Sequence, residues 1–174
     1  AGFYATLKHA KLPMAKLIQP AIDLAEQGFA ITEKEANLLN NQMQYFNEHN
    51  KIQTVFQKKN KWKQGDILIQ KDLAETLKLI QKNGAKGFYE GKTAELIVAE
   101  MKHGNGIITL NDLKNYKVAE RKPIVFDYKG NEIVSMPLPS SGGILLAQML
   151  KMAGYENLEK YQQNSTEAVQ IMVE

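Results

Sequence analysis

The stretch 137–143, with the sequence Pro-Leu-Pro-Ser-Ser-Gly-Gly, most constrains how this chain can fold. Residues 133–136 before it are mostly apolar, and residues 144–150 after it are apolar at helical spacing. Proline fixes φ, and paired glycines open backbone angles closed to other residues. The pattern therefore predicts a strand that ends in a tight turn leading directly into a helix. Either Ser140 or Ser141 is expected to cap that helix by accepting a hydrogen bond from a free backbone N–H.

The predicted turn has a structural and a functional interpretation. It is either a plain capped turn or a place where backbone N–H groups at the start of a helix hold an anion. A nucleophile elbow needs Gly-x-Ser-x-Gly, and here Leu138 or Pro139 stands where the first glycine would be, so the spacing argues against serine catalysis. The candidate binding or site-lining residues are those of the turn: Pro139, Ser140, Ser141, Gly142 and Gly143.

Apolar residues at three- and four-residue spacing predict a mostly helical chain. Pro20 is expected to kink or divide the second helix, and Thr32 and Asp72 to cap the helices that follow them. The stretch 87–91 predicts a turn bracketed by glycines, and 47–65 a long polar loop anchored by Trp62. Helices are predicted over 1–11, 13–27, 33–46, 72–83, 93–103, 144–153 and 165–174, with a short helical turn at 111–116.

The period of the pattern changes after Val118. The runs 124–128 and 132–136 are typical of strands, and the connection 129–131 contains a glycine, which predicts a β-hairpin. The fold class is therefore α+β: mostly helical, with one β-hairpin. At 174 residues the chain is expected to form a single domain over 1–174.

Composition excludes several classes of function. There is no cysteine, which excludes disulfides, thiolate metal sites and a cysteine nucleophile. His9, His49 and His103 stand far apart, so no metal site and no cofactor is expected. The net charge is +3, but Arg121 is the one arginine, and nucleic-acid binding is not expected. No apolar run approaches the roughly 20 residues of a membrane span.

A series of short motifs along the chain, taken in order, resembles the γ-glutamyltranspeptidases, also called glutathione hydrolases. Each motif is weak alone, but their order covers almost the whole chain. Met14 and Leu138 depart from the family's usual pattern. The matching segments are Leu-Pro at 12–13, and the stretches 20–29, 65–68, 70–77, 88–91, 108–116 and 137–143.

The resemblance implies a precursor of the N-terminal nucleophile class that cuts itself into a large and a small subunit. A threonine exposed by the cut takes the γ-glutamyl group from glutathione and passes it to water or an amino acceptor. The chain is similar to the central to C-terminal part of the large subunit only, a truncated piece within a larger layered αββα architecture. The resemblance places that threonine beyond Glu174 and the substrate-binding arginine before Ala1, so no catalytic residue is carried over.

By the same resemblance, the partners are the small subunit of the same precursor and a glutathione-type γ-glutamyl substrate, and the location is periplasmic or secreted. The fragment alone is expected to be inactive. Its cut helices are expected to leave apolar faces exposed and so to favour self-association. The alternative is a non-enzymatic anion-binding or scaffold module that uses the 137–143 turn and a lysine-rich docking face.

Overall fold

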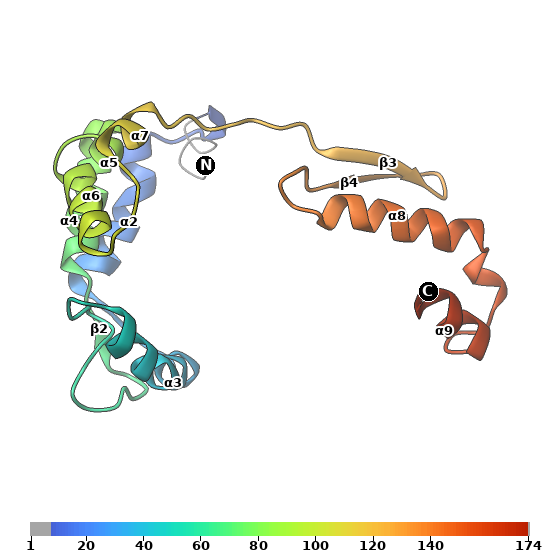
Figure 1. Ribbon diagram of the computed structural model, residues 1–174, viewed down its shortest axis with the longest axis horizontal. Helices are drawn as coiled ribbons and strands as arrows, with labels where there is room; N and C mark the ends of the chain where they lie inside the picture. The colour runs from blue at the N-terminus through green and yellow to red at the C-terminus, as the bar shows by residue number, and fades with distance from the viewer. Residues whose placement is uncertain (1–7, 174) are drawn as a thin grey trace. The chain divides into compact units, whose positions relative to one another are not determined.

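The computed structural model describes residues 8–173 (Figure 1), so the helix predicted over 1–11 lies mostly outside the described residues. The chain divides into two compact units, residues 1–118 and 119–174. A single domain over 1–174 stays a prediction. The first unit contains α2 (Met14–Gln27), β1 (Phe29–Ala30), α3 (Glu33–His49), β2 (Ile67–Leu68), α4 (Lys71–Asn83), α5 (Lys86–Tyr89), α6 (Gly91–His103) and α7 (Leu110–Asn115).

The second unit is a hairpin followed by helices. It contains β3 (Ile124–Tyr128), β4 (Asn131–Ser135), α8 (Gly142–Tyr155), the 3-10 helix η1 (Leu158–Lys160) and α9 (Thr166–Val173). The two strands pair antiparallel with Phe126 opposite Ile133, which confirms the predicted hairpin. A mostly helical chain with two small antiparallel sheets is thus what the structure shows. Among the described residues no helix is both long and apolar enough to cross a membrane.

Helices α2 and α4 pack together through a small isoleucine core. Ile18, Ile22 and Ile80 are buried there, and Phe88 of α5 packs against them. The buried residues of α2 are Ile18, Ile22 and Ala25, whereas Leu17 and Leu24, which also recur at helical spacing, are exposed. Both stripes are apolar at helical spacing, and the position of α4 decides which one is buried. Pro20 lies inside α2, which continues through it as one helix.

Two of the predicted local signals have different outcomes. The Thr32 hydroxyl accepts from the Glu35 N–H at 3.3 Å, and the Glu35 carboxylate accepts from the Thr32 N–H at 2.7 Å, which confirms the capping box. The cap predicted at Asp72 is wrong: α4 begins one residue earlier, after Gln70, and has no side-chain cap. Asp72 lies instead in the first turn of α4, where its negative charge interacts favourably with the positive end of the helix dipole.

The glycine-bracketed turn predicted at 87–91 is instead the short helix α5 and the start of α6. A Cβ on Gly87 would lie 2.1 Å from the Leu79 carbonyl oxygen, so only glycine allows α5 to approach α4 this closely. The Thr93 hydroxyl donates to the Gly87 carbonyl at 2.9 Å. Helix α7 begins with a second capping box, between Thr109 and Asp112.

The long loop after α3 is held by Trp62, as predicted. Helix α3 runs to His49, two residues past the predicted start of the loop. Trp62 is 7% exposed and packs in a cluster with Ile31 and Leu68. The Asn40 side chain bonds both backbone groups of Trp62, accepting from its N–H at 2.8 Å and donating to its carbonyl at 2.9 Å.

We expect Asn40→Ala to destabilise the first unit by about 1–3 kcal/mol, because two backbone groups of a half-buried loop lose their partners together. The free energy of unfolding is measured by urea titration with Trp62 fluorescence. Asn41→Ala is the matched control, an exposed neighbour for which the structure shows no side-chain bond within residues 8–173. Equal losses in both variants would contradict this role for Asn40.

The stability of the same cluster is expected to fall in acid. Backbone and side-chain hydrogen bonds from Thr32 hold the pKa of Glu35 below its ordinary value of 4.5. Ionised Glu35 therefore contributes stability above pH 4.5, and this is lost as the pH falls through the folded pKa. Glu35→Gln keeps a capping-box side chain but cannot titrate. Its urea midpoint should fall less than that of the unaltered chain between pH 6 and pH 3, and an identical fall would refute the assignment.

Candidate functional site

The 137–143 turn joins β4 to α8 through short, local hydrogen bonds. The Ser140 N–H donates to the Pro137 carbonyl at 3.3 Å. The Ser140 hydroxyl accepts from the Gly142 N–H at 3.3 Å, so Ser140 is the serine that satisfies a free N–H of the helix start. Ser141 occupies the N-cap position without a side-chain bond, and its carbonyl accepts from the Leu145 N–H at 3.0 Å. Pro139 is exposed and follows a cis peptide bond.

The two glycines of the turn have different roles. A Cβ on Gly143 would lie 2.2 Å from the Met136 carbonyl oxygen and 3.2 Å from the Ile124 side chain. Gly143 is buried, and its missing side chain lets the first turn of α8 lie directly against the end of the hairpin. A Cβ on Gly142 would meet only the Ser140 hydroxyl, at an ordinary 3.4 Å. The close approach therefore requires Gly143 and not Gly142.

The turn offers little for serine chemistry. Ser141 is exposed, and the Ser140 hydroxyl is bonded to a backbone N–H rather than to a base. All three histidines belong to the first unit. Within the described residues, the N–H groups of Gly143 and Ile144 have no acceptor, but Gly143 is buried beneath Met136. The role of Pro139, Ser140, Ser141, Gly142 and Gly143 in lining a site stays a prediction.

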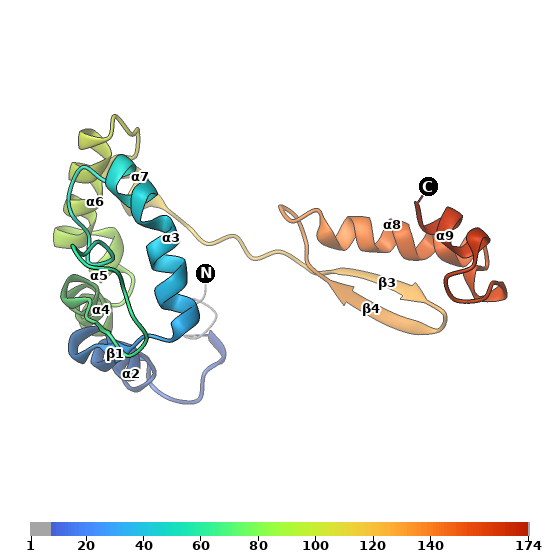
Figure 2. The ribbon, with the colours of Figure 1, turned by 90° about the horizontal axis from the view of Figure 1, so that it is seen from below.

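Helix α8 lies along the hairpin (Figure 2) and covers only one face of the hairpin. The residues of β3 and β4 alternate, so that Phe126 and Ile133 are half-buried while Val125 and Val134 are exposed. The helix is apolar on its open side as well. Leu145, Met149 and Met152 recur there at four and three residues and are all more than half exposed. Such a helix is typical of a protein interior.

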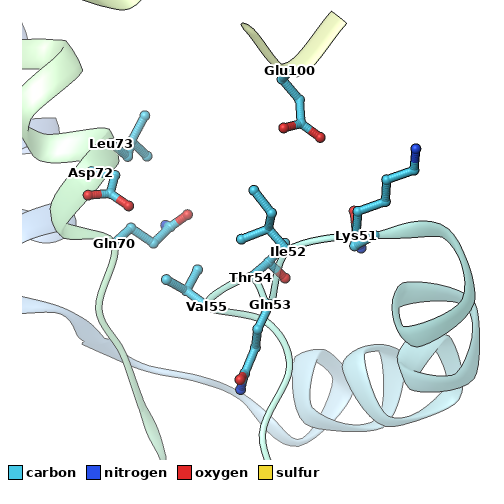
Figure 3. A pocket seen from close by; sticks show the side chains of 10 residues that line it. Lys51, Ile52, Gln53, Thr54, Val55, Gln70, Asp72, Leu73 and Glu100 are labelled. Carbon is cyan, nitrogen blue, oxygen red and sulfur yellow. The ribbon is translucent and has the colours of Figure 1, made fainter. Parts of the chain in front are cut away.

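A second feature, in the first unit, was not singled out from the sequence. A hollow of about 470 Å³ lies between the loop after α3, the first turn of α4 and the last turn of α6 (Figure 3). Its walls include Ile52, Val55 and Leu73, with the carboxylates of Asp72 and Glu100 at its edges. The one available signal was the length of the polar loop, because loops this long are usually functional or packed against other elements. Within residues 8–173 no group of three or more metal-ligating side chains forms.

Comparison with known proteins gives the family. The family model described as gamma-glutamyltranspeptidase matches residues 1–174. The chain is 40% identical over 177 residues to the glutathione hydrolase proenzyme of Escherichia coli (strain K12), a match that covers 100% of this chain and 30% of that relative. This chain belongs to the γ-glutamyltranspeptidase family.

Solved structures agree with this assignment. The crystal structure of Helicobacter pylori gamma-glutamyltranspeptidase superposes with a TM-score of 0.90 at 39% identity, over 98% of this chain and 50% of that one. The Bacillus anthracis transpeptidase enzyme CapD superposes with a TM-score of 0.79 at 36% identity, over 98% of this chain and 58% of that one. The chain thus spans about half the length of these solved chains and about a third of the curated E. coli relative.

We expect Gly143→Ala to destabilise the second unit by about 1–3 kcal/mol, because the added methyl group overlaps the Met136 carbonyl. Gly142→Ala is the matched control, and it should be neutral or stabilising by up to about 1 kcal/mol, since alanine favours a helix and meets no close atom. Hydrogen-exchange rates of the α8 and β4 amides measure the effect. Equal protection in the two variants would overturn the close-approach assignment.

Proposed function

We propose that this chain is part of the large subunit of a γ-glutamyltranspeptidase, which transfers or hydrolyses the γ-glutamyl group of glutathione and related γ-glutamyl compounds. The observation that carries the proposal is the superposition over 98% of the chain on the H. pylori enzyme, with a TM-score of 0.90. The E. coli relative, named a glutathione hydrolase proenzyme, supports the same activity. The substrate class is carried over from these relatives as part of the proposal.

The chain acts with a small subunit cut from the same precursor, within a layered αββα architecture. The word proenzyme in the relative's name supports a precursor that is cut. The second unit supports a larger assembly, because a two-stranded hairpin is marginal alone and one of its faces is left exposed at Val125 and Val134. In the absence of that assembly, the exposed apolar side of α8 favours self-association of the chain.

The catalytic nucleophile lies outside this chain. A hydroxyl nucleophile needs a neighbouring base, within hydrogen-bond reach, to take its proton. Here Thr76 and Thr93 donate to backbone carbonyls, and Thr32 and Thr109 to carboxylates. Ser140 and Ser165 accept from backbone N–H groups. None of these contacts joins a hydroxyl to a nitrogen base, which supports an inactive fragment.

The location we propose is periplasmic or secreted, as implied by the resemblance to exported family members. A chain without cysteine is suited to an oxidising compartment, where a free thiol is a liability. The non-enzymatic anion-binding module remains the alternative. The structure disfavours anion binding at the 137–143 turn, because the Gly142 N–H already donates to the Ser140 hydroxyl and Gly143 is buried against the Met136 carbonyl.

The proposal is tested with a chromogenic γ-glutamyl anilide. The 174-residue chain alone should give no turnover above a heat-denatured control, because it lacks the nucleophile. The complete reading frame that contains this segment should give turnover and two bands on a denaturing gel. Turnover by the fragment would sink the assignment of the nucleophile, and an uncut, inactive complete protein would sink the enzymatic proposal.

A further inference from the structure

The loop between α3 and β2, residues 50–66, gathers positive charge on an ordered backbone (Figure 1). Its sequence holds five lysines and a single acidic residue, Asp66. The Asn40 side chain bonds both backbone groups of Trp62, and the Trp62 indole N–H donates to the Phe56 carbonyl at 2.8 Å. The lysines that neighbour Trp62 therefore project from a fixed support.

The buried indole ring decides which way the neighbouring lysines point. Trp62 is 7% exposed, whereas Lys61 and Lys63 on either side of it are exposed. This alternation is that of an extended segment, in which side chains two residues apart lie on the same face, about 7 Å from each other. Lys61 and Lys63 therefore face the solvent together, opposite the side that packs into the unit. Lys59 is exposed as well.

One lysine of the run 58–63 is neutralised by a neighbour. The Lys58 ammonium group pairs with Asp66 at 2.5 Å and lies 4.5 Å from the centre of the Trp62 ring. Hydrogen bonds from the Lys58 side chain and from the Lys63 N–H hold the pKa of Asp66 below its ordinary value of 3.8, so this carboxylate is charged at neutral pH. The other three ammonium groups form no ion pair with any residue between 8 and 173: Lys59, Lys61 and Lys63.

The chemistry of this surface fits phosphate groups spread over a plane better than it fits a nucleic acid or a protein. Lysine binds phosphate as a point charge, without the planar fork through which arginine reads bases and carboxylates. The aromatic side chain among these lysines, Trp62, is buried, so it cannot stack on a base or anchor a protein interface. Lysine is also depleted in protein–protein interfaces. An anionic bilayer needs none of these features, because its negative surface potential attracts clustered lysines.

We propose that the lysine run 58–63 is a contact surface for the anionic headgroups of a lipid bilayer. Its three unpaired lysines lie against lipid phosphates, while Trp62 stays buried in its unit and Lys58 stays paired with Asp66. The contact is electrostatic and reversible, because each lysine near such a surface strengthens binding only about fivefold. The proposal uses residues of the first unit alone and does not rest on the enzymatic proposal.

The test is co-sedimentation of the 174-residue chain with vesicles made of equal parts of phosphatidylglycerol and phosphatidylcholine. Vesicles of phosphatidylcholine alone measure any binding through the exposed apolar side of α8. The loop variant, Lys59→Gln/Lys61→Gln/Lys63→Gln, should bind the anionic vesicles about a hundredfold more weakly than the unaltered chain. The single variant Lys61→Gln should bind them about fivefold more weakly.

The matched control variant is Lys82→Gln/Lys92→Gln/Lys114→Gln. It removes the same formal charge from exposed positions on three separate helices, so it should weaken binding less than about threefold. Raising the ionic strength from about 0.1 M to about 1 M shortens the Debye length from about 10 Å to about 3 Å, which should release the unaltered chain from the anionic vesicles.

Three outcomes would overturn the proposal. The first is equal binding to the anionic and the neutral vesicles. The second is equal affinity of the loop variant and the control variant for the anionic vesicles, since binding would then follow net charge and not this loop. The third is binding to a thymidine oligonucleotide as tight as to the anionic vesicles, which would indicate a nucleic acid instead. All of the altered side chains are exposed, so these variants should keep the fold, which the Trp62 fluorescence spectrum checks.

Discussion

The contact between the α8 backbone and the end of β4 is the constraint on which the second unit depends. A two-stranded hairpin has no interior of its own, so its half-buried face needs a helix laid along it. At Gly143 the helix comes so close that a single methyl group would overlap the Met136 carbonyl. Within the turn, the Ser140 N–H donates to the Pro137 carbonyl, and the Ser140 hydroxyl accepts from the Gly142 N–H. Gly143 is therefore the residue of the turn that the packing of this unit most requires.

The first unit solves a different problem, a long polar segment that must be ordered without much apolar surface. The Asn40 side chain hydrogen-bonds both the N–H and the carbonyl of Trp62, so the backbone of Trp62 is satisfied without a neighbouring strand. The indole ring then brings its own apolar area into the Ile31 cluster, while its N–H donates to the Phe56 carbonyl. The Lys58 ammonium lies 4.5 Å from the centre of the same ring and pairs with Asp66. One aromatic side chain therefore orders most of the loop.

Local signals in the sequence were sufficient wherever the physics is local. The capping box at Thr32 and the existence of the hairpin depend on neighbouring residues, and both were predictable, although the second strand begins at Asn131, one residue before its predicted start. The buried face of α2 was not, because two adjacent apolar stripes fit the same spacing and only the position of α4 selects Ile18 and Ile22. The start of α4 was also missed, since Asp72 is equally suited to a cap and to a first turn.

The two features of possible function differ in how they relate to the sequence. The 137–143 turn is conspicuous as a sequence motif. The close packing of Gly143 against the Met136 carbonyl accounts for the glycine at that position. The hollow has no motif, because its walls come from a loop and two helices that are distant in sequence. Its walls leave Ile52, Val55 and Leu73 partly exposed, and they carry charges of both signs, at Asp72, Glu100 and Lys51. A feature assembled in this way is found only when the tertiary structure is known.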